Sequence, residues 1–564
     1  MSDRMHPIPF SSLVDWALTE WSQQGTVFGC QKTYHATAQQ SIPYAGRQLE
    51  LPLGVAAGPH TQLAQNLAAA YVCGGRVFEL KTVQILDGED LHVSKPCILA
   101  EDEGYNCEWS TELTVPQAME EYVKGWCLLH LLAKELQLGE QDGFVFNMSV
   151  GYDLAGIQSE KIDRFIRGLK DASQTDIFQR CKEELRAVLP RCRHMTAEDV
   201  DNISPHICNS VTMSTMHGCP AAQIEEIANY LLEEKNLDLY LKCNPTLLGY
   251  DRVREALDGL GFHYIQFDRE QFASDLQYED AVPMIRRLWE KAQKLGRFFG
   301  VKLTNTFPVQ VRNHELPDET MYMSGRTLLP LSLGVAQLLG REFQGKLPIS
   351  YCGGINAQNV ASVYATGISP ITVCTDLLKP GGYHRLHSTA INLESAQLSP
   401  RQEVDVDAVG RLARTLCGPA GATHDVRRKP VPETPVCTHA CKTTCGCCVT
   451  LCPNRANVVI TVAGQRQMLH LDGLCNECGN CASFCPEKFA PYLEKFTVFC
   501  SPEEMENSRN SGFAPLDQQR YRFAVRLNGQ RWELDLTQPD PAIPRDLVDI
   551  ILTVVDVYPY LLYC

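Results

Sequence analysis

Two cysteine runs near the C-terminal end of the 564-residue chain repeat each other, and they restrict how this part can fold. They read CKTTCGCCVTLCPNRAN (residues 441–457) and CNECGNCASFCPEKF (residues 475–489). Three pairs of equivalent cysteines lie 33 residues apart, and the first pair, Cys441 and Cys475, lies 34 residues apart. The repeat therefore has one extra residue in its first loop, and a proline follows the fourth cysteine of each run.

This spacing is typical of iron–sulfur runs in which the fourth cysteine of each run binds the cluster of the other run. We therefore predict two [4Fe–4S] clusters. The first would have Cys441, Cys445, Cys448 and Cys485 as ligands, and the second Cys475, Cys478, Cys481 and Cys452. A paired zinc site is the alternative, but zinc sites use cysteine pairs and do not repeat a run that ends in proline. Cys447 is interpreted as a bystander.

Charge and composition argue against several classes of partner. The formal charge of −16 and the absence of a Lys/Arg block argue against a nucleic-acid partner. No stretch reaches 18 uninterrupted apolar residues, and the N-terminal segment does not resemble a signal peptide. We therefore expect a cytoplasmic protein with no membrane partner, in which most of the 25 cysteines are small buried side chains or metal ligands.

A segment rich in glycine, proline and charge, GPAGATHDVRRKPVPETP (residues 418–435), divides the chain. We predict a large N-terminal domain with an N-terminal extension over 1–415, a linker over 416–436, a two-cluster ferredoxin-like domain over 437–495 and a small β/α cap over 496–564. The cap contains three short strand patterns, FTVFC, RFAVRL and RWELDL, and its last 18 residues are typical of a docked terminal helix.

The N-terminal domain alternates short apolar strands with longer helical patterns, which indicates parallel β/α units in an α/β fold. Strand candidates lie at 49–58, 77–83, 144–150, 207–215, 237–244, 262–268, 298–306, 348–354 and 371–377, with helical patterns such as 221–235 and 282–296. Nine candidates are one too many for a (β/α)8 TIM barrel, and periodicity does not choose between 262–268 and 298–306. A doubly wound sheet is the rival, but no GxGxxG opens a helix.

Polar residues follow these strands at their carboxyl ends, where barrel enzymes carry their active sites. They include Gly58, Lys81, Thr82, Asn147, Lys242, Asn305, Gly353, Gly354, Cys374 and Thr375. Backbone N–H groups after the last two strands are the usual phosphate site of this fold.

Short motifs make a resemblance specific. AAGP, ELKT, YLKCNP, MSGR, CGGI and VCTD occur in the order found in dihydroorotate dehydrogenase-like FMN barrels. A barrel followed by a bacterial-type ferredoxin domain is similar to the C-terminal half of dihydropyrimidine dehydrogenase. GPHTQLAQN, FNMSVGY, STMHGCP, LLKPGGY and CPNRAN resemble the selenate reductase subunit family of enteric bacteria. Those relatives carry an FAD- and NADPH-binding half, whereas only the linker lies at that position here.

The resemblance implies an FMN site. Lys81 and Lys242 would contact the flavin ring, and Asn147 and Asn305 its edge. Ser324, Gly325, Gly353, Gly354, Cys374 and Thr375 would hold the phosphate, and Ala57, Gly58 and Thr82 would complete the cofactor site. The role of Lys302 stays open because it lies on one of the two disputed strands.

Reduction of a C=C or C=N bond by a flavin needs a proton donor as well as a hydride. The resemblance implies that this donor lies in STMHGCP (residues 214–220), with Cys219 as the catalytic acid and His217 as donor or partner. Either residue could instead be structural, and His60 is a further candidate for the pocket wall.

We therefore expect an iron–sulfur flavoprotein subunit that passes electrons between a partner and an FMN site acting on a small purine- or pyrimidine-like heterocycle. The expected partner is an FAD- or NAD(P)H-dependent flavoprotein, a ferredoxin or a molybdenum hydroxylase. The alternative is a non-catalytic scaffold and electron conduit whose barrel holds no flavin.

Overall fold

The computed structural model describes most of the 564-residue chain. The residues outside the description are 1–3, 38–40, 45–46, 92, 102, 108–109, 215–216, 313, 417–436, 438–440, 442–444, 539–540 and 564. The predicted linker over 416–436 lies outside the described residues except for Leu416.

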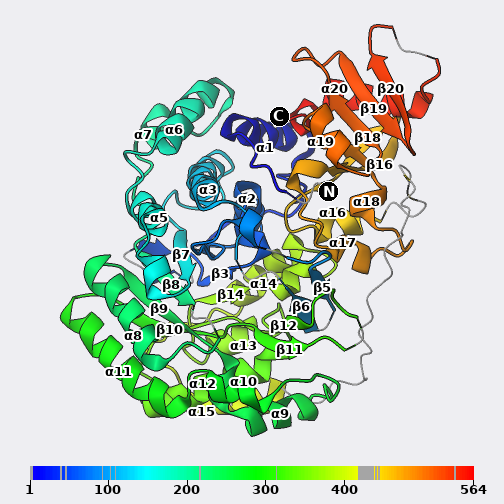
Figure 1. Ribbon diagram of the computed structural model, residues 1–564. Coiled ribbons are helices and arrows are strands. Elements are labelled where there is room, and N and C mark those ends of the chain that lie inside the picture. Colours follow the sequence, from blue (N-terminus) through cyan, green and yellow to red (C-terminus); the bar gives the residue numbers. More distant parts are fainter. Residues whose placement is uncertain are drawn as a thin grey trace.

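Eight parallel strands close into a barrel, which confirms the predicted (β/α)8 fold (Figure 1). The strands are β3 (Leu53–Val55), β4 (Val77–Glu79), β7 (Val145–Gly151), β8 (Ser210–Ser214), β9 (Asp238–Cys243), β10 (Phe299–Leu303), β13 (Ile349–Tyr351) and β14 (Ile371–Val373). β14 pairs with β3 and closes the ring. Nearly every strand residue is buried, as expected for a parallel sheet covered by helices.

Helices surround the barrel. They include α2 (Ala64–Val72), α3 (Val115–Glu135), α5 (Glu160–Lys170), α6 (Asp176–Val188), α8 (Ala221–Asn229), α9 (Tyr250–Gly259), α10 (Arg269–Ser274), α11 (Tyr278–Lys294), α12 (Leu328–Glu342), α13 (Val360–Tyr364), α14 (Tyr383–Ser395) and α15 (Val406–Leu416). Local sequence sets their starts: Thr114 accepts a hydrogen bond from the Gln117 N–H at the start of α3, and Ser159 caps α5 in the same way.

The disputed sixth strand is β10, so the candidate at 298–306 belongs to the barrel and the one at 262–268 does not. Residues 262–268 form no strand, although Phe262, Ile265 and Phe267 are buried. These side chains pack with Phe272 and Phe307 in a second hydrophobic cluster outside the barrel. The apolar residues of this strand candidate are therefore buried, but they pack an irregular segment on this cluster.

A four-stranded antiparallel sheet lies at the carboxyl ends of the barrel strands. Its strands are β5 (Ile98–Ala100), β6 (Glu103–Asn106), β11 (Phe307–Gln310) and β12 (Thr320–Gly325), in the order β11-β12-β6-β5. Gly104 on β6 is required by close packing, because a Cβ there would lie 2.4 Å from Thr375 Cγ2 and 2.7 Å from Ser324 Oγ. This sheet was not predicted from the sequence.

The cysteine runs and the C-terminal segment share one six-stranded sheet. Its strands are β15 (Asn457–Val462), β16 (Gln465–Leu471), β17 (Phe496–Val498), β18 (Gly512–Pro515), β19 (Arg522–Leu527) and β20 (Gln530–Asp535). The three predicted strand patterns of the cap are thus strands, but β16 pairs with β17 across the predicted boundary at 495/496. Short helices α16 (Cys447–Leu451) and α17 (Asn480–Ser483) carry cysteines of the two runs.

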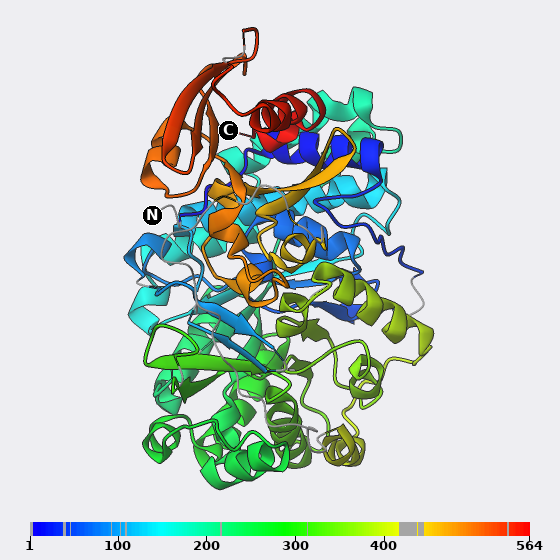
Figure 2. The same ribbon diagram turned by 90° about the vertical axis from the view of Figure 1, so that its right-hand side faces the viewer.

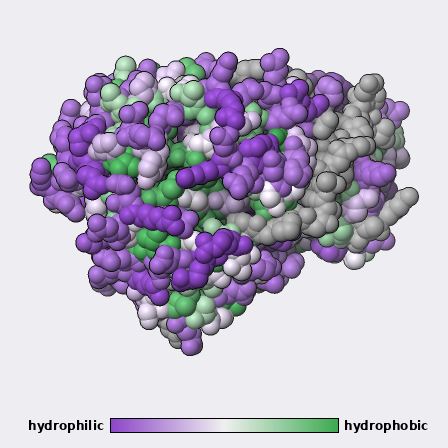
Figure 3. Space-filling model, turned by 90° about the horizontal axis from the view of Figure 1, so that it is seen from below, coloured by the Kyte–Doolittle hydropathy of each residue, from purple (hydrophilic) through white to green (hydrophobic). Residues whose placement is uncertain are grey.

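The two ends of the chain lie together beside this sheet (Figure 2). The predicted terminal helix is α20 (Arg545–Val557), which is followed by a turn that packs on α1 (Phe10–Gln24). Trp16 stacks on Tyr560 with ring centroids 5.6 Å apart. In the part of the chain that the structure describes, no helix is long and apolar enough to cross a membrane. The face seen in Figure 3 is largely hydrophilic, with hydrophobic side chains gathered near its middle.

The cysteine-rich part is packed tightly on the barrel. Asn454, in the first run, accepts hydrogen bonds from Gln62 and Asn66 near the start of α2 and donates one to Asn476 in the second run. A Cβ at Gly382, before α14, would lie 1.7 Å from the Thr450 carbonyl oxygen. The barrel and the cysteine runs are therefore in direct, buried contact.

Candidate functional site

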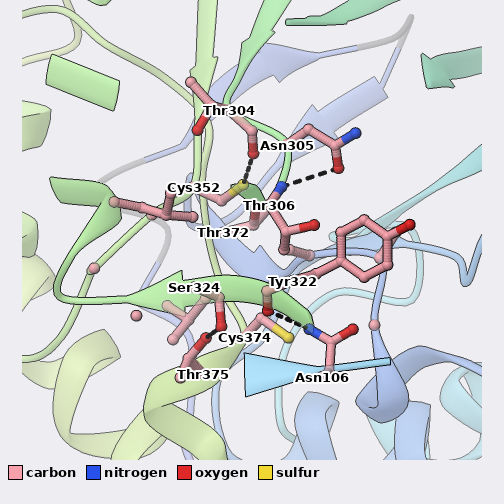
Figure 4. A pocket seen from close by; sticks show the side chains of 18 of the residues that line it. Asn106, Thr304, Asn305, Thr306, Tyr322, Ser324, Cys352, Thr372, Cys374 and Thr375 are labelled. Atoms are coloured by element: carbon pink, nitrogen blue, oxygen red, sulfur yellow. Dashed lines mark hydrogen bonds between the residues drawn. The ribbon is translucent and has the colours of Figure 1, made fainter. Parts of the chain in front are cut away.

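A cavity of about 540 Å³ opens at the carboxyl ends of the barrel strands, beneath the four-stranded sheet. In Figure 4, Thr304, Asn305, Thr306 and Cys352 lie on one side of it, and Asn106, Tyr322, Ser324, Cys374 and Thr375 lie on the other. Its volume is in the range of sites for small molecules and cofactors.

Most of the predicted site residues line this cavity. They are Ala57, Gly58, Lys81, Thr82, His217, Lys242, Asn305, Ser324, Gly325, Gly353, Gly354, Cys374 and Thr375. Most of them come from loops after six barrel strands, which closure of the barrel brings together, while Lys242 lies near the end of β9 and Ser324 and Gly325 lie on β12 of the four-stranded sheet.

Four residues considered from the sequence do not line the cavity. Asn147 lies within β7, which continues to Gly151, and its amide group donates a 2.6 Å hydrogen bond to Thr212 and accepts another from Ser210. Cys219 points elsewhere, with Sγ 3.4 Å from Gln223 Oε1. His60 packs edge-on against Tyr383, and burial lowers its pKa to about 3.

Lys302 is the fourth such residue, and it lies in the barrel interior. Its side chain is fully buried, and its Nζ lies 2.5 Å from Glu79 Oε1. It also donates hydrogen bonds of 2.6 Å to Thr372 and 3.1 Å to Ser350. Only Thr372 of this group lines the cavity, so Lys302 lies one hydrogen bond away from it.

Two glycines form a tight turn at one end of the cavity. Gly353 and Gly354 follow β13 with φ of 124° and 68°, a region that favours glycine. A Cβ at Gly354 would lie 2.8 Å from Leu329 Cβ, and one at Gly353 would lie 2.7 Å from Ser332 Oγ. Neither glycine N–H has an acceptor within the described chain. Together with Arg326 and the Thr375 hydroxyl, this turn can receive an anion.

Two lysines also line the cavity. Lys81 follows β4 and is 4% exposed, while Lys242 is near the end of β9 and half-buried. Burial raises the pKa of the cavity residue Cys352, although the charges of Lys302 and Lys242 act to lower it. The cavity therefore combines the two lysines with the backbone N–H groups of the Gly353–Gly354 turn.

His217 is held by a buried carboxylate that sequence analysis did not find. Its Nδ1 lies 2.7 Å from Oδ2 of Asp275, whose side chain is fully buried. The Gly218 N–H and the Thr246 hydroxyl also donate to Asp275, at 2.7 and 2.8 Å. Asp275 follows α10, 58 residues after His217. No spacing rule connects the two, so only the fold reveals the pair.

Arg326 and Tyr322 were also missed, although both line the cavity. Arg326 ends the MSGR motif, which was a usable signal. Tyr322 lies on β12, in the four-stranded sheet that the sequence did not predict.

The eight predicted cluster ligands gather in two groups. Cys441, Cys445, Cys448 and Cys485 line one small pocket, together with Cys447. In the second group, burial raises the pKa of Cys475 well above its ordinary value, and the nearby Cys452, Cys478 and Cys481 thiolates raise it further. Within the described residues, no three histidine, cysteine or acidic side chains converge closely enough to hold a single metal ion.

The second cysteine group adjoins the cavity. The Ile98 N–H donates a 3.0 Å hydrogen bond to the Cys478 carbonyl, and the Asn480 amide donates one of 3.0 Å to the Leu378 carbonyl. Both Ile98 and Leu378 line the cavity. The same cysteines also adjoin the first group, because the Cys448 thiolate acts to raise the pKa of Cys481.

Comparison with known families concerns the barrel. The family described as oxidoreductase YgfK, N-terminal TIM-barrel domain, matches residues 28–421. The chain belongs to the YgfK oxidoreductase family. YgfK proteins of Escherichia coli strain K12 and of E. coli O157:H7 are each 46% identical to it over 427 residues. This alignment covers 73% of the chain, and the chain spans only 41% of the length of these relatives.

The YgfK family match ends at residue 421, before the first cysteine run, so it says nothing of the clusters. Among solved structures, the ligand-free DHODH of Eimeria tenella is 14% identical with a TM-score of 0.38, covering 71% of this chain and 98% of that one. The DHODH of Eimeria tenella in complex with ferulenol is 15% identical with a TM-score of 0.38, and the match covers 72% of this chain and 96% of that one. These likenesses are too weak to carry an argument. The relationship to an oxidoreductase barrel is confirmed, and the resemblance to selenate reductase subunits stays an expectation.

Proposed function

We propose that this YgfK-family chain is an iron–sulfur flavoprotein that exchanges electrons with a partner and reduces or oxidises a small heterocycle at an FMN in the barrel cavity. When bound, FMN would couple one-electron transfer by the clusters to two-electron chemistry on the substrate. The proposal builds on the cavity, on the two cysteine groups and on the contact between them.

The cavity fits FMN in charge and shape. The Gly353–Gly354 turn, Arg326 and Thr375 would hold the phosphate, because the turn offers backbone donors and has no room for side chains. Lys81 and Lys242 would lie beside the ring system, where positive charge favours the reduced form. Asn305 would complete the ring site, while Asn147 has no part in it because its amide is engaged inside the barrel.

The observation that carries the proposal is the contact between the second cysteine group and the cavity wall. Cys478 and Asn480 bond directly to the backbone of Ile98 and Leu378, which line the cavity. Such short contacts suit electron transfer between a cluster held by the second cysteine group and a flavin in the cavity. A cubane cluster holds its four thiolates on separate iron atoms, so it needs ligands further apart than those of one ion.

The first cysteine group is suited to meet a partner. Cys445 is exposed, whereas all four cysteines of the second group are buried. A partner flavoprotein, a ferredoxin or a molybdenum hydroxylase would therefore exchange electrons at this surface. The sequence has no GxGxxG fingerprint for binding a dinucleotide by itself.

The remaining cavity wall suits a heterocyclic substrate. Asn106, Thr306 and Tyr322 are uncharged hydrogen-bonding residues that line the cavity beside Asn305. Amide and hydroxyl groups of this kind pair with the ring N–H and carbonyl groups of purine- and pyrimidine-like molecules.

A stopped-flow experiment tests the electron route. The protein, loaded with iron–sulfur clusters and FMN, is mixed anaerobically with a reduced bacterial ferredoxin, which is too large to enter the cavity. We expect flavin reduction in the wild type and in Cys447→Ser, which changes a cysteine outside the two quartets. Cys478→Ser should slow it at least tenfold. Equal flavin reduction rates in Cys478→Ser and in the wild type would refute the route.

A further inference from the structure

His217, in the loop after β8, forms a histidine–carboxylate pair at the cavity wall with Asp275, which follows α10. Because a carboxylate accepts but does not donate, the His217–Asp275 contact of 2.7 Å fixes the proton of the neutral ring on Nδ1. His217 lines the cavity, and its other nitrogen, Nε2, is buried with no hydrogen-bond partner in the described chain. A buried polar atom without a partner is costly, so this nitrogen is suited to a bound molecule.

We propose that His217 exchanges a proton with the substrate through Nε2 and that Asp275 is the positioning residue that keeps the ring in the required tautomer. This inference rests on the proposed function, because it assigns the proton transfer that flavin chemistry at this cavity needs.

The step balances in both directions. In reduction, one atom of the substrate double bond receives a hydride from the flavin, and the other receives the proton of the His217 Nε2–H. That N–H bond breaks with its electron pair on Nε2, which leaves a neutral ring that still donates from Nδ1 to Asp275. A proton from solvent then restores the imidazolium. Oxidation is the reverse, with Nε2 as the base.

Asp275 is built to remain a carboxylate. It accepts from His217, Gly218 and Thr246, which uses both of its oxygens. Burial raises the pKa of Asp275, but the hydrogen bonds and charge of His217, together with the other donors, hold it below its ordinary value. The anion can therefore stabilise a protonated His217 ring.

Asparagine at position 275 would disturb this arrangement in a defined way. It has one acceptor oxygen and an NH₂ group in place of two acceptor oxygens. If the oxygen keeps the Gly218 N–H, the NH₂ group faces His217 Nδ1 and forces the ring proton to Nε2. The tautomer then blocks Nε2 as a base, as in catalytic triads that carry the same substitution. It also weakens the ring as an acid, because Nδ1 cannot carry a proton against the NH₂ group and the imidazolium loses its carboxylate partner.

Cys219 provides a matched control. It lies two residues after His217 in the same loop, but its thiol contacts Gln223 and does not line the cavity. Burial and the nearby Asp153 charge raise the pKa of Cys219, which makes it a poor source of thiolate. Of the two candidates from the sequence, His217 lines the cavity and Cys219 does not, so the proposal assigns the role of acid to His217.

The first test measures proton transfer. Protein loaded with FMN is reduced with dithionite, and its reoxidation by uracil, thymine or hypoxanthine is followed anaerobically by flavin absorbance. We expect His217→Ala to slow reoxidation about 10²- to 10⁴-fold, with partial rescue by added imidazole. Asp275→Asn should slow it at least tenfold without rescue, and Cys219→Ala should match the wild type. A wild-type rate in His217→Ala would overturn the proposal.

The second test needs neither substrate nor flavin. Nitrogen-15 NMR of ring-labelled histidines, with the His217 signal identified by its loss in His217→Gln, reports which nitrogen carries the proton. We expect Nδ1–H in the wild type and in Cys219→Ala, and Nε2–H in Asp275→Asn. An Nε2–H form in the wild type would overturn the role of Asp275. If no heterocycle reoxidises the wild type, the proposed substrate class fails, while the NMR result still decides the pair.

Discussion

Replacement of Lys302 by methionine tests whether this residue is part of the barrel interior, as the structure indicates, or part of the cofactor site. The Lys302 side chain is fully buried and that of Glu79 is 3% exposed, with 2.5 Å between Nζ and Oε1. Glu79 Oε2 is buried and has no hydrogen-bond partner in the described chain. Lys302→Met therefore leaves a buried carboxylate without its cation.

The cost follows from the burial of the pair. Removing one partner of a buried ion pair costs about 3–5 kcal/mol, whereas replacing both partners by apolar residues is often neutral or stabilising. We therefore expect Lys302→Met to lower the free energy of unfolding by about 3–5 kcal/mol. The double variant Lys302→Met, Glu79→Leu should recover most of this loss.

Urea unfolding followed by tryptophan fluorescence measures these differences. The control is Arg286→Met, which breaks the exposed pair with Glu342 (48% and 37% exposed, 2.8 Å) and should cost about 0.2–1 kcal/mol. A loss below about 1 kcal/mol in Lys302→Met would refute the buried pair. A double variant that is no more stable than Lys302→Met would also refute the buried pair.

Three further predictions concern the cavity and the core. Gly354→Ala should weaken FMN binding, measured by fluorescence titration, because the added Cβ would lie 2.8 Å from Leu329 Cβ. The control is Gly464→Ala, which has a comparable φ of 81° and no atom within 4 Å of the added Cβ, and it should leave FMN affinity unchanged. Lys242→Met should weaken FMN binding about 10- to 100-fold in the same titration without loss of iron, because it removes a charged donor from the cavity wall; an unchanged affinity would exclude Lys242 from the site. His130→Phe should make stability less sensitive to acid. Burial among Trp126 and Phe144 lowers the pKa of His130 to about 3 in the folded state, against about 6.5 in the unfolded state. Because the unfolded state binds the proton first, stability falls as the pH drops from about 6.5 towards 3. His130 alone contributes a loss of about 2 kcal/mol at pH 5, so urea titrations at pH 7 and pH 5 should show a loss of stability that is about 2 kcal/mol larger in the wild type than in His130→Phe.

The barrel was predictable because its strands are short, continuous apolar runs separated by amphipathic helices. Eight of the nine strand candidates form the barrel. The ninth, 262–268, is also rich in apolar residues, but its side chains pack in a cluster outside the barrel. Local sequence does not record which core a buried side chain joins, so periodicity could not exclude this segment.

The cavity wall was largely predictable because residues after parallel strands must meet at one end of a closed barrel. Asn147 does not line the cavity because β7 runs four residues beyond it, to Gly151, and an apolar run in the sequence does not fix where a strand ends. Asp275 could not be found, because its relation to His217 depends on a contact across 58 residues of chain. Cys219 and His217 are two residues apart, and only backbone geometry decides which of them lines the cavity.

The cysteine groups followed from the repeat itself. The crossed assignment of Cys485 to the first group predicts that this residue lies with Cys441, Cys445 and Cys448, and all four line one pocket. The contact of the second group with the barrel cavity could not be predicted, since it depends on hydrogen bonds from the Ile98 backbone N–H and the Asn480 side-chain amide.

Cofactor content measures the central claim most directly. The protein is purified anaerobically, and its iron, acid-labile sulfide and acid-released flavin are determined per chain. The account predicts about eight iron atoms, about eight sulfides and about one FMN. Iron and sulfide without flavin would contradict the catalytic barrel and leave a scaffold that conducts electrons, and flavin without iron would contradict the electron route.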